Sequence, residues 1–316
     1  MKPRILLAGK TGQLGSELGR LLPTLGEVIA PERKELDLCE PEQIRQAMRS
    51  VKPQLVINAA AYTAVDRAET DQATALAVNV KAPDLLAQEA KKIGAMLVHF
   101  STDYVFDGSN KAPYVETDSP NPLNAYGRTK LAGEEAIRNS GAAYLIFRTS
   151  WVYATHGRNF LLTILRLATE REELKIVADQ VGAPTCAVDL AEATTRILAG
   201  TISSSTSQFA FAEASGTYHM TAAGQTTWHE FANAILEEAC HAPQNVPWLA
   251  STTKGRPLIA RRVVPIPTEK FPLPARRPAY SVLSNARLKQ VFGVTLPDWR
   301  TQLHQCFAGR SFERLS

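Results

Sequence analysis

The chain has few cysteines, and they show no pairing pattern. Four occur in 316 residues, far apart, at Cys39, Cys186, Cys240 and Cys306. Disulfide frameworks and zinc sites need cysteines at short, repeated spacings. We therefore expect free thiols, which are typical of the reducing cytoplasm.

Long apolar runs are absent as well. No stretch of the sequence approaches the ~20 apolar residues that cross a bilayer. The first apolar run already begins at Ile5, which leaves no room for a signal peptide before it. These absences predict a cytoplasmic protein with no membrane partner.

Neither the spacing of the histidines nor the net charge indicates a metal or a nucleic-acid ligand. The six histidines show no metal-ligand spacing, and the formal net charge is only +4. Basic residues do gather near the C-terminus, in a stretch that holds six prolines between residues 257 and 278. Proline at this density predicts a loop and not a recognition helix, so we expect no nucleic-acid partner.

That basic stretch leaves two interpretations open. It can be a solvated surface loop, or it can clamp a small diphosphate, because arginine offers two parallel donors to phosphate oxygens. Its basic residues are Lys254, Arg256, Arg261, Arg262, Lys270, Arg276 and Arg277.

The N-terminus does carry an informative pattern. The apolar run 5–8 fits a buried parallel strand and is followed by Gly9, Gly12 and Gly15, then by a helical apolar period that continues to residue 22. Gly9 can take a sharp bend, Gly12 lets backbone amides approach a pyrophosphate, and Gly15 allows close packing of helix on strand. This order predicts a dinucleotide-binding turn, with a merely structural turn as the alternative.

Strands and helices alternate through the first half of the chain. Such alternation predicts an α/β fold, namely a Rossmann-like, doubly wound parallel sheet with a smaller C-terminal substrate-binding lobe. We expect residues 1–155 with about 187–224 to form the dinucleotide-binding domain, and about 156–186 with 225–316 to form the lobe. Expected strands cover 26–30, 54–59, 95–101, 143–149 and 217–222, and expected helices cover 41–50, 71–93, 124–139 and 189–198.

Cofactor choice stays open at the second strand. Glu32 would bond the ribose hydroxyls of NADH, whereas Arg33 or Lys34 would favour the phosphate of NADPH. Because both kinds of residue occur together, the sequence allows either cofactor.

Tyr126 and Lys130 stand four positions apart in the expected helix 124–139 and so share one face. A cation held there would stabilise the phenolate and lower the pKa of the tyrosine. So short a motif also occurs by chance. Its place in a dinucleotide-binding fold favours proton transfer to or from a substrate oxygen.

Several longer motifs together resemble the extended short-chain dehydrogenase/reductases, and within them the branch that reduces dTDP-linked 4-dehydro sugars. The resemblance covers nearly the whole chain. Its motifs are the glycine turn and residues 58–66 (NAAAYTAVD), 101–106 (STDYVF), 126–130 (YGRTK), 147–153 (FRTSWVY), 179–185 (DQVGAPT) and 226–231 (TTWHEF).

The resemblance implies the roles of individual residues. A nicotinamide cofactor would reduce the C4 ketone of a dTDP-linked 6-deoxyhexose, with Tyr126 as proton donor, Lys130 holding Tyr126 partly ionisable and bonding the nicotinamide ribose, and Thr102 bonding the same substrate oxygen. The implied cofactor contacts are Gly9, Gly12, Gln13, Leu14, Gly15, Glu32, Asp37, Leu38, Ala61, Tyr62, Thr63, Tyr126 and Lys130, and the implied sugar contacts are Thr102, Asp103 and Trp151. For Trp151, a place in the core is the alternative.

The resemblance also leaves other outcomes open. Some members hold Mg²⁺ at a subunit contact built from carboxylates, but Arg300 stands here where they have an acidic residue. We therefore expect no metal site, and a homodimer is one possible assembly. Alternative functions are a nucleotide-sugar epimerase or dehydratase and a non-catalytic regulatory subunit. Tyr104 after Asp103, where dehydratases have Glu, argues against elimination.

Overall fold

A six-stranded sheet forms the centre of the computed structural model, which describes residues 2–203, 214–243 and 246–308. Every neighbouring pair in this sheet is parallel. In spatial order the strands are β10 (Gly216–His219), β5 (Ala143–Thr149), β4 (Met96–Thr102), β3 (Leu55–Asn58), β1 (Arg4–Ala8) and β2 (Glu27–Ile29). The predicted parallel α/β fold is thereby confirmed.

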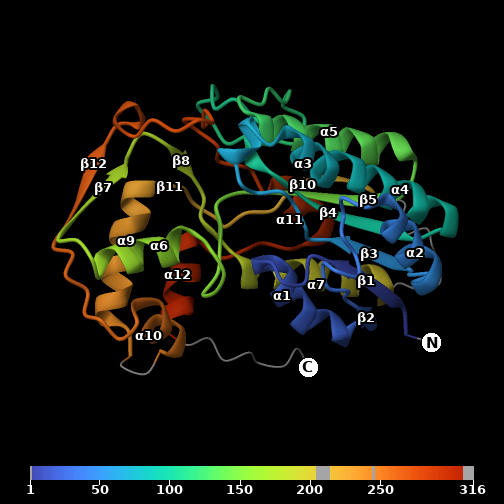
Figure 1. The fold of residues 1–316 in the computed structure, drawn as a ribbon, viewed down its shortest axis with the longest axis horizontal. Coiled ribbons are helices and arrows are strands. Elements are labelled where there is room, and N and C mark those ends of the chain that lie inside the picture. The colour runs from blue at the N-terminus through green and yellow to red at the C-terminus, as the bar shows by residue number, and fades with distance from the viewer. Residues whose placement is uncertain (1, 204–213, 244–245, 309–316) are drawn as a thin grey trace.

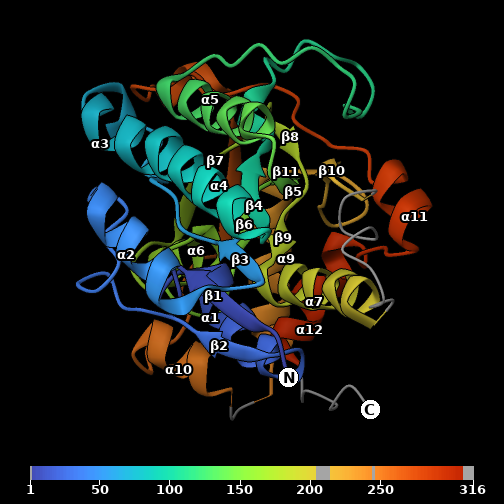
Figure 2. The same ribbon diagram turned by 90° about the vertical axis from the view of Figure 1, so that its right-hand side faces the viewer.

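Helices cover both faces of the sheet (Figures 1 and 2). One face carries α1 (Gln13–Leu21) and α7 (Ala187–Ser203), and the other carries α2 (Pro41–Val51), α4 (Ala82–Ile93) and α5 (Ala125–Ser140). Successive strand side chains point to opposite faces, so β1, β3, β4 and β5 each contribute to two separate apolar clusters. This is why these strands are mainly apolar and do not alternate with polar residues.

The chain reverses its direction of travel across the sheet at β1. From β1 it passes outward to β2, and it then returns to β3 on the opposite side of β1. In open parallel sheets, ligands bind at such a switch point, beyond the carboxyl ends of the strands. The topology therefore directs attention to the residues that follow β1 and β3.

The helix expected over residues 71–93 is divided into three segments. Between α3 (Gln72–Leu76) and α4 lies a single turn of π-helix, η3 (Ala77–Lys81). Within η3, the Asn79 side chain accepts a hydrogen bond from the Tyr62 N–H at 2.9 Å and donates to the Thr129 hydroxyl at 3.1 Å. Such π-turns recur at functional sites, and this one supports the loop after β3.

The second half of the chain builds a smaller lobe with its own apolar cluster, at the left of Figure 1. Its helices are α6 (Phe160–Ala168), α9 (Trp228–His241), α10 (Pro247–Thr253) and α12 (Trp299–Phe307), while α11 (Ala286–Phe292) packs near the main sheet. Its paired strands are β7 (Glu173–Val177) with β12 (Arg262–Ile266), β8 (Val181–Gly182) with β11 (Thr226–Thr227), and β6 (Val152–Tyr153) with β9 (Thr185–Cys186). No helix in the described part of the chain is long and apolar enough to span a membrane.

The sequence predicted a loop over the whole proline-rich basic stretch, but the structure shows regular elements within it. It contains β12 and the short η5 (Thr268–Lys270). Pro265 lies inside β12, which pairs with β7 in a two-stranded sheet. An edge strand tolerates proline because one side of its backbone donates no ladder hydrogen bond.

A buried ion-pair network joins α5 to the sheet. The Glu134 carboxylate accepts two hydrogen bonds from Arg148 of β5, at 2.9 and 2.7 Å, and one from Ser101 of β4 at 2.5 Å. Glu134 and Arg148 are almost fully buried, and Arg138 lies 3.1 Å from the same carboxylate. Burial alone would raise the pKa of Glu134. The interactions with Arg148 above all, and with Ser101 and Arg138, outweigh burial and hold this pKa below its usual value.

We predict that Glu134→Ala lowers the free energy of unfolding by about 3–5 kcal/mol, because Arg148 is left buried without its partner. Urea denaturation followed by circular dichroism measures the change. Glu135→Ala, on the exposed face of the same helix, is the matched control and should change stability by less than about 0.5 kcal/mol. Equal losses in the two variants would contradict the prediction.

Candidate active site

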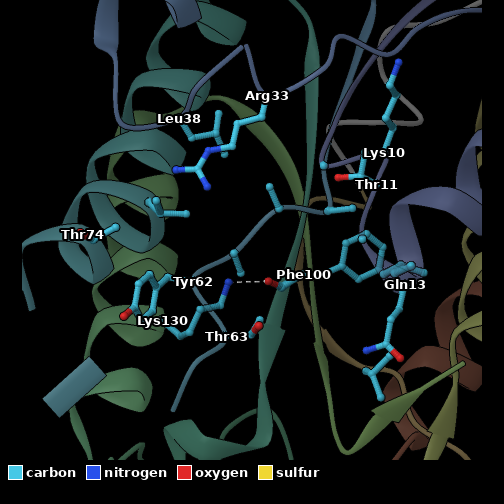
Figure 3. Close-up of a pocket in the computed structure, with 18 of the residues that line it drawn as sticks. Lys10, Thr11, Gln13, Arg33, Leu38, Tyr62, Thr63, Thr74, Phe100 and Lys130 are labelled. Carbon is cyan, nitrogen blue, oxygen red and sulfur yellow. Dashed lines mark hydrogen bonds between the residues drawn. The ribbon is translucent and has the colours of Figure 1, made fainter. Parts of the chain in front are cut away.

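A cavity of about 630 Å³ opens at the carboxyl ends of β1, β3 and β4 (Figure 3). Its walls come from the turn after β1, the loops after β2 and β3, and the first turns of α5. Most of the residues that the sequence predicts as cofactor contacts line this cavity, namely Gly9, Gly12, Gln13, Leu14, Asp37, Leu38, Ala61, Tyr62, Thr63, Tyr126 and Lys130. The structure thus gathers most of the expected cofactor contacts in one place.

The glycine turn has the geometry that a pyrophosphate requires. Gly9 has φ +87°, and a Cβ there would lie 2.7 Å from the backbone nitrogen of Ala60. The Gly12 N–H donates to the Gly9 carbonyl at 3.0 Å, and α1 begins directly afterwards, at Gln13. The free N–H groups at this helix start can bind an anion at the cavity wall.

The loop after β2 separates the two residues that bear on cofactor choice. Arg33 lines the cavity, and its Nε lies 3.3 Å from Asp37 Oδ2. Glu32 does not line the cavity; its exposed carboxylate forms an ion pair with Lys34 at 3.4 Å. Of these two residues it is therefore Arg33 that lines the cavity, and it lies near Leu38 in Figure 3, whereas the adenosine contact was expected of Glu32.

The proton-transfer candidates come together at the opposite end of the cavity. Asn124 caps α5 by accepting the Gly127 N–H at 2.8 Å, which sets Tyr126 and Lys130 on successive turns facing the cavity. Thr102 ends β4 just behind the cavity wall, is buried, and forms a hydrogen bond with the Tyr126 hydroxyl. All three predicted catalytic residues therefore lie at one site.

Lys130 is held by β4. Its Nζ donates to the Phe100 carbonyl at 2.6 Å, drawn as the dashed line in Figure 3, and lies 3.1 Å from His99 Nε2. The side chain is 1% exposed. Burial lowers the pKa of Lys130 to about 8, although the charge of Glu134 opposes the shift.

Tyr126 differs in one respect from the sequence-based expectation. We expected Lys130 to make it partly ionisable, but burial raises the pKa of Tyr126 to about 12. The hydrogen bond to Thr102 opposes this rise, and the nearby Asp103 carboxyl adds to it. Tyr126 is consequently a protonated phenol near neutral pH, which is the form that donates a proton.

Asp103 lies beside this group and is buried. Its Oδ1 accepts the Thr102 hydroxyl at 3.1 Å, whereas Oδ2 has no hydrogen-bond partner among the described residues. Burial raises the pKa of Asp103 to about 7, against the effect of hydrogen bonds from Ser281 and Thr102. An unpaired buried carboxyl oxygen can receive a hydroxyl of a bound molecule.

Trp151 forms an aromatic stack that the sequence did not indicate. Its ring lies 3.5 Å from that of Trp228, with 7° between the planes, and its φ is +46°. A Cβ at Gly182 would come within 2.5 Å of the indole, so only glycine fits there. Left-handed backbone at a bulky residue costs about 1–3 kcal/mol and tends to occur at functional sites. Trp151 lines neither cavity described here.

A second cavity of about 800 Å³ lies in the lobe, between α6, β7 and the chain after η5. Its lining includes Trp228, Gln180, Arg276 and Arg277. Arg276 is exposed there.

Arg277 forms an ion pair with Asp66. It binds Asp66 through both carboxylate oxygens, at 3.0 and 2.7 Å, and this pairing lowers the pKa of Asp66. Of the two arginines of the basic stretch that line this cavity, Arg276 is the one that does not pair with Asp66. Sequence reasoning missed the Asp66–Arg277 pair because 211 positions separate the two residues.

No metal site is found in the described ranges, where no group of three or more His, Cys, Asp or Glu side chains could hold an ion. Arg300, which argued against a metal, places its guanidinium 4.6 Å from the centroid of the Trp299 ring.

Comparison with known proteins agrees with this geometry. The family model of the RmlD substrate binding domain matches residues 1–311. The chain belongs to this family. A relative in Burkholderia thailandensis named dTDP-4-dehydrorhamnose reductase is 51% identical and covers 96% of this chain and 97% of its own, and one in Escherichia coli K12 with the same name is 43% identical and covers 94% of each.

A solved structure extends the likeness to three dimensions. The dTDP-4-dehydrorhamnose reductase of Bacillus anthracis, solved in complex with NADP, is 33% identical, with a TM-score of 0.83 over 97% of this chain and 99% of that one. The fold described for this RmlD-family chain is thus one that crystallography has found in a relative.

We predict that Gly15→Ala weakens dinucleotide binding and costs about 1–3 kcal/mol of stability, because its Cβ would lie 2.0 Å from the Gly9 carbonyl oxygen and force the turn to move. Titration with NADP⁺ and urea denaturation measure the two effects. Gly19→Ala, in the same helix, is the control: its nearest contact is 3.8 Å away, and it should be neutral or gain about 0.5–1 kcal/mol. Unchanged NADP⁺ affinity in Gly15→Ala would contradict the prediction.

Proposed function

We propose that the protein reduces the C4 ketone of dTDP-4-dehydro-β-L-rhamnose to give dTDP-L-rhamnose, with NADPH or NADH as reductant. The observation that carries this proposal is that Thr102, Tyr126 and Lys130 meet at the end of a dinucleotide-sized cavity. Family membership and relatives of up to 51% identity along almost the whole chain support the substrate.

The chain's own residues would bind and orient the reactants. The glycine turn and the start of α1 would hold the pyrophosphate, Arg33, Asp37 and Leu38 the adenosine, and Tyr62 and Thr63 the nicotinamide side. When bound, the reduced nicotinamide supplies a hydride to the carbonyl carbon.

Proton transfer would then belong to Tyr126. Its hydroxyl is protonated near neutral pH and can give its proton to the oxygen that gains negative charge. Thr102 would supply a second donor to the same oxygen when its hydroxyl turns from Asp103 Oδ1 to the substrate. A positioned acid is worth about 10²–10⁴ in rate, and a preorganised donor to an oxyanion about 10²–10³.

The sugar would lie between Asp103 and Trp151. Asp103 Oδ2 has no partner among the described residues and so can accept a sugar hydroxyl. The indole of Trp151, held by its stack on Trp228, offers an apolar wall to a deoxysugar ring. We also propose a division into residues 1–155 with about 187–224 and about 156–186 with 225–316, which the separate apolar clusters of the main sheet and of the lobe support; α11, inside the second range, packs in the cluster of the main sheet.

Arg33 favours NADPH over NADH. A guanidinium in the cavity beside Leu38 is suited to a ribose 2′-phosphate, and the acidic Glu32 lies outside it. A homodimeric assembly is a further proposal, which comes from the family resemblance, and a cytoplasmic location is another, which comes from the scattered cysteines of the sequence.

The deciding experiment is to incubate the protein with the keto sugar and NADPH or NADH. The loss of reduced-nicotinamide absorbance measures the reaction, and the sugar product is then identified. We expect dTDP-L-rhamnose and faster turnover with NADPH. Tight cofactor binding with no oxidation would instead favour a regulatory subunit, and a different sugar product would favour an epimerase.

Tyr126→Phe should lower kcat by at least ~10² with nearly unchanged affinity for NADPH, because only the donated proton is lost. Steady-state kinetics and NADPH titration separate the two effects. Tyr144→Phe serves as control, since Tyr144 lies on β5 and lines neither cavity. Normal turnover of Tyr126→Phe would remove Tyr126 from the mechanism.

Arg276→Gln should raise the KM for the sugar nucleotide about tenfold and leave the KM for NADPH unchanged, because one charge-assisted hydrogen bond to phosphate is worth about 1.5–3 kcal/mol. Arg261→Gln is the matched control, exposed and outside both cavities. Equal changes in the two KM values would mean that Arg276 is only a surface residue.

A further inference from the structure

A buried hydrogen-bond chain leads from β3 through β4 to Lys130. Asn58 and His99 are paired in register on neighbouring strands, and neither side chain is exposed. Asn58 Nδ2 lies 3.2 Å from His99 Nδ1, and His99 Nε2 lies 3.1 Å from Lys130 Nζ. The proposed reaction gives neither Asn58 nor His99 a role.

The orientation of the Asn58 amide is fixed by the backbone. Asn58 Oδ1 accepts a hydrogen bond from the Ala60 N–H at 3.2 Å. A backbone N–H can only donate, so the atom that faces it must be the amide oxygen. The amide NH₂ therefore faces His99, and Nδ1 of His99 must be the acceptor.

The position of the proton on His99 follows from this. Burial holds the pKa of His99 well below its usual value, and a charge on Lys130 lowers it further, so the ring is neutral in either form of Lys130. A neutral imidazole whose Nδ1 accepts carries its proton on Nε2. That N–H points at the Nζ of Lys130.

Only the neutral amine of Lys130 satisfies both of its neighbours. Its lone pair can accept from His99 Nε2–H while one of its hydrogens bonds the Phe100 carbonyl. An ammonium has no lone pair and would set one N–H against another.

We propose that Asn58 and His99 are positioning residues that favour the neutral amine of Lys130. To become an ammonium, Lys130 takes up one proton, and His99 must move its own proton from Nε2 to Nδ1 and lose the hydrogen bond from Asn58. The imidazole stays neutral throughout. The inference rests on the proposed function only for its effect on turnover.

Other charged and titratable groups near Lys130 act in known directions. Glu134, one turn further along α5, favours the ammonium, and its carboxylate is shared with Arg148 of β5 and Arg138. Tyr126 lies one turn earlier and is protonated near neutral pH. The pKa of about 8 for Lys130 shows that burial outweighs Glu134, and the His99 N–H acts in the same direction as burial.

The test is the tautomer of His99, read from two-bond ¹⁵N–¹H NMR correlations of the full chain at a pH near 9, above the pKa of Lys130. We expect a proton on Nε2. A proton on Nδ1 at this pH overturns the inference. The measurement needs no turnover, so it stands apart from the proposed function: an inactive protein with Nε2–H would defeat the function and keep the inference.

Asn58→Asp reverses the constraint and keeps the acceptor for Ala60. A carboxylate only accepts, so His99 should change to the Nδ1–H form. Because the family resemblance implies that turnover depends on the Lys130 ammonium, kcat should fall at alkaline pH as Lys130 loses its proton, and in this variant that alkaline limb should move up by about one pH unit. Asn233→Asp, exposed on α9, controls for added charge. An unchanged tautomer and an unchanged limb would overturn the inference, and if Asn58→Asp does not fold, the tautomer of the unchanged protein decides alone.

Discussion

Everything at the candidate site depends on three parallel strands, β1, β3 and β4, ending at one edge of the sheet. Their register sets Ala8, Asn58 and His99 side by side. The glycine turn, the small residues after Asn58, and Phe100 and Ser101 near the end of β4 must then line a common space, with Thr102 just behind its wall. Helix α5 completes it, because Gly127 packs directly on the backbone of Tyr104, where a Cβ would come within 2.2 Å.

This arrangement leaves Lys130 with almost no exposure to solvent, which is unfavourable for a charged side chain. A buried amine needs hydrogen-bond partners, and β4 provides the Phe100 carbonyl as an acceptor and the His99 imidazole as the second partner of Nζ. Glu134 provides negative charge one turn away, and it is itself held by Arg148. The network below the site and the chemistry at the site are therefore one electrostatic unit.

Much of this could be predicted from the sequence, because its signals are local. A strand, three glycines and a helix follow one another within 22 residues, and Tyr126 and Lys130 share a face because helical geometry repeats every 3.6 residues. The order of strands and helices was sufficient for the parallel sheet. The roles of the site residues stay predictions until they are measured.

What the sequence could not indicate depends on packing between distant segments. Whether Glu32 or Arg33 lines the cavity depends on the conformation of a short turn, where the sequence has no periodicity. The partners of Lys130 follow from how α5 lies on β4, and the stack of Trp151 on Trp228 joins segments that are far apart in the chain. The short β12 was missed because proline normally argues against a strand.

The segment 275–277 connects the second cavity to the main domain. It lines the second cavity, yet it is bonded to the main domain: Ala275 N–H donates to Asp66, Arg277 pairs with the same carboxylate, and Asn124 Nδ2 donates to the Arg276 carbonyl at 2.7 Å. Asn124 also caps the helix that carries Tyr126. The wall of the second cavity is therefore joined by hydrogen bonds to the residue that begins α5, the helix that carries Tyr126.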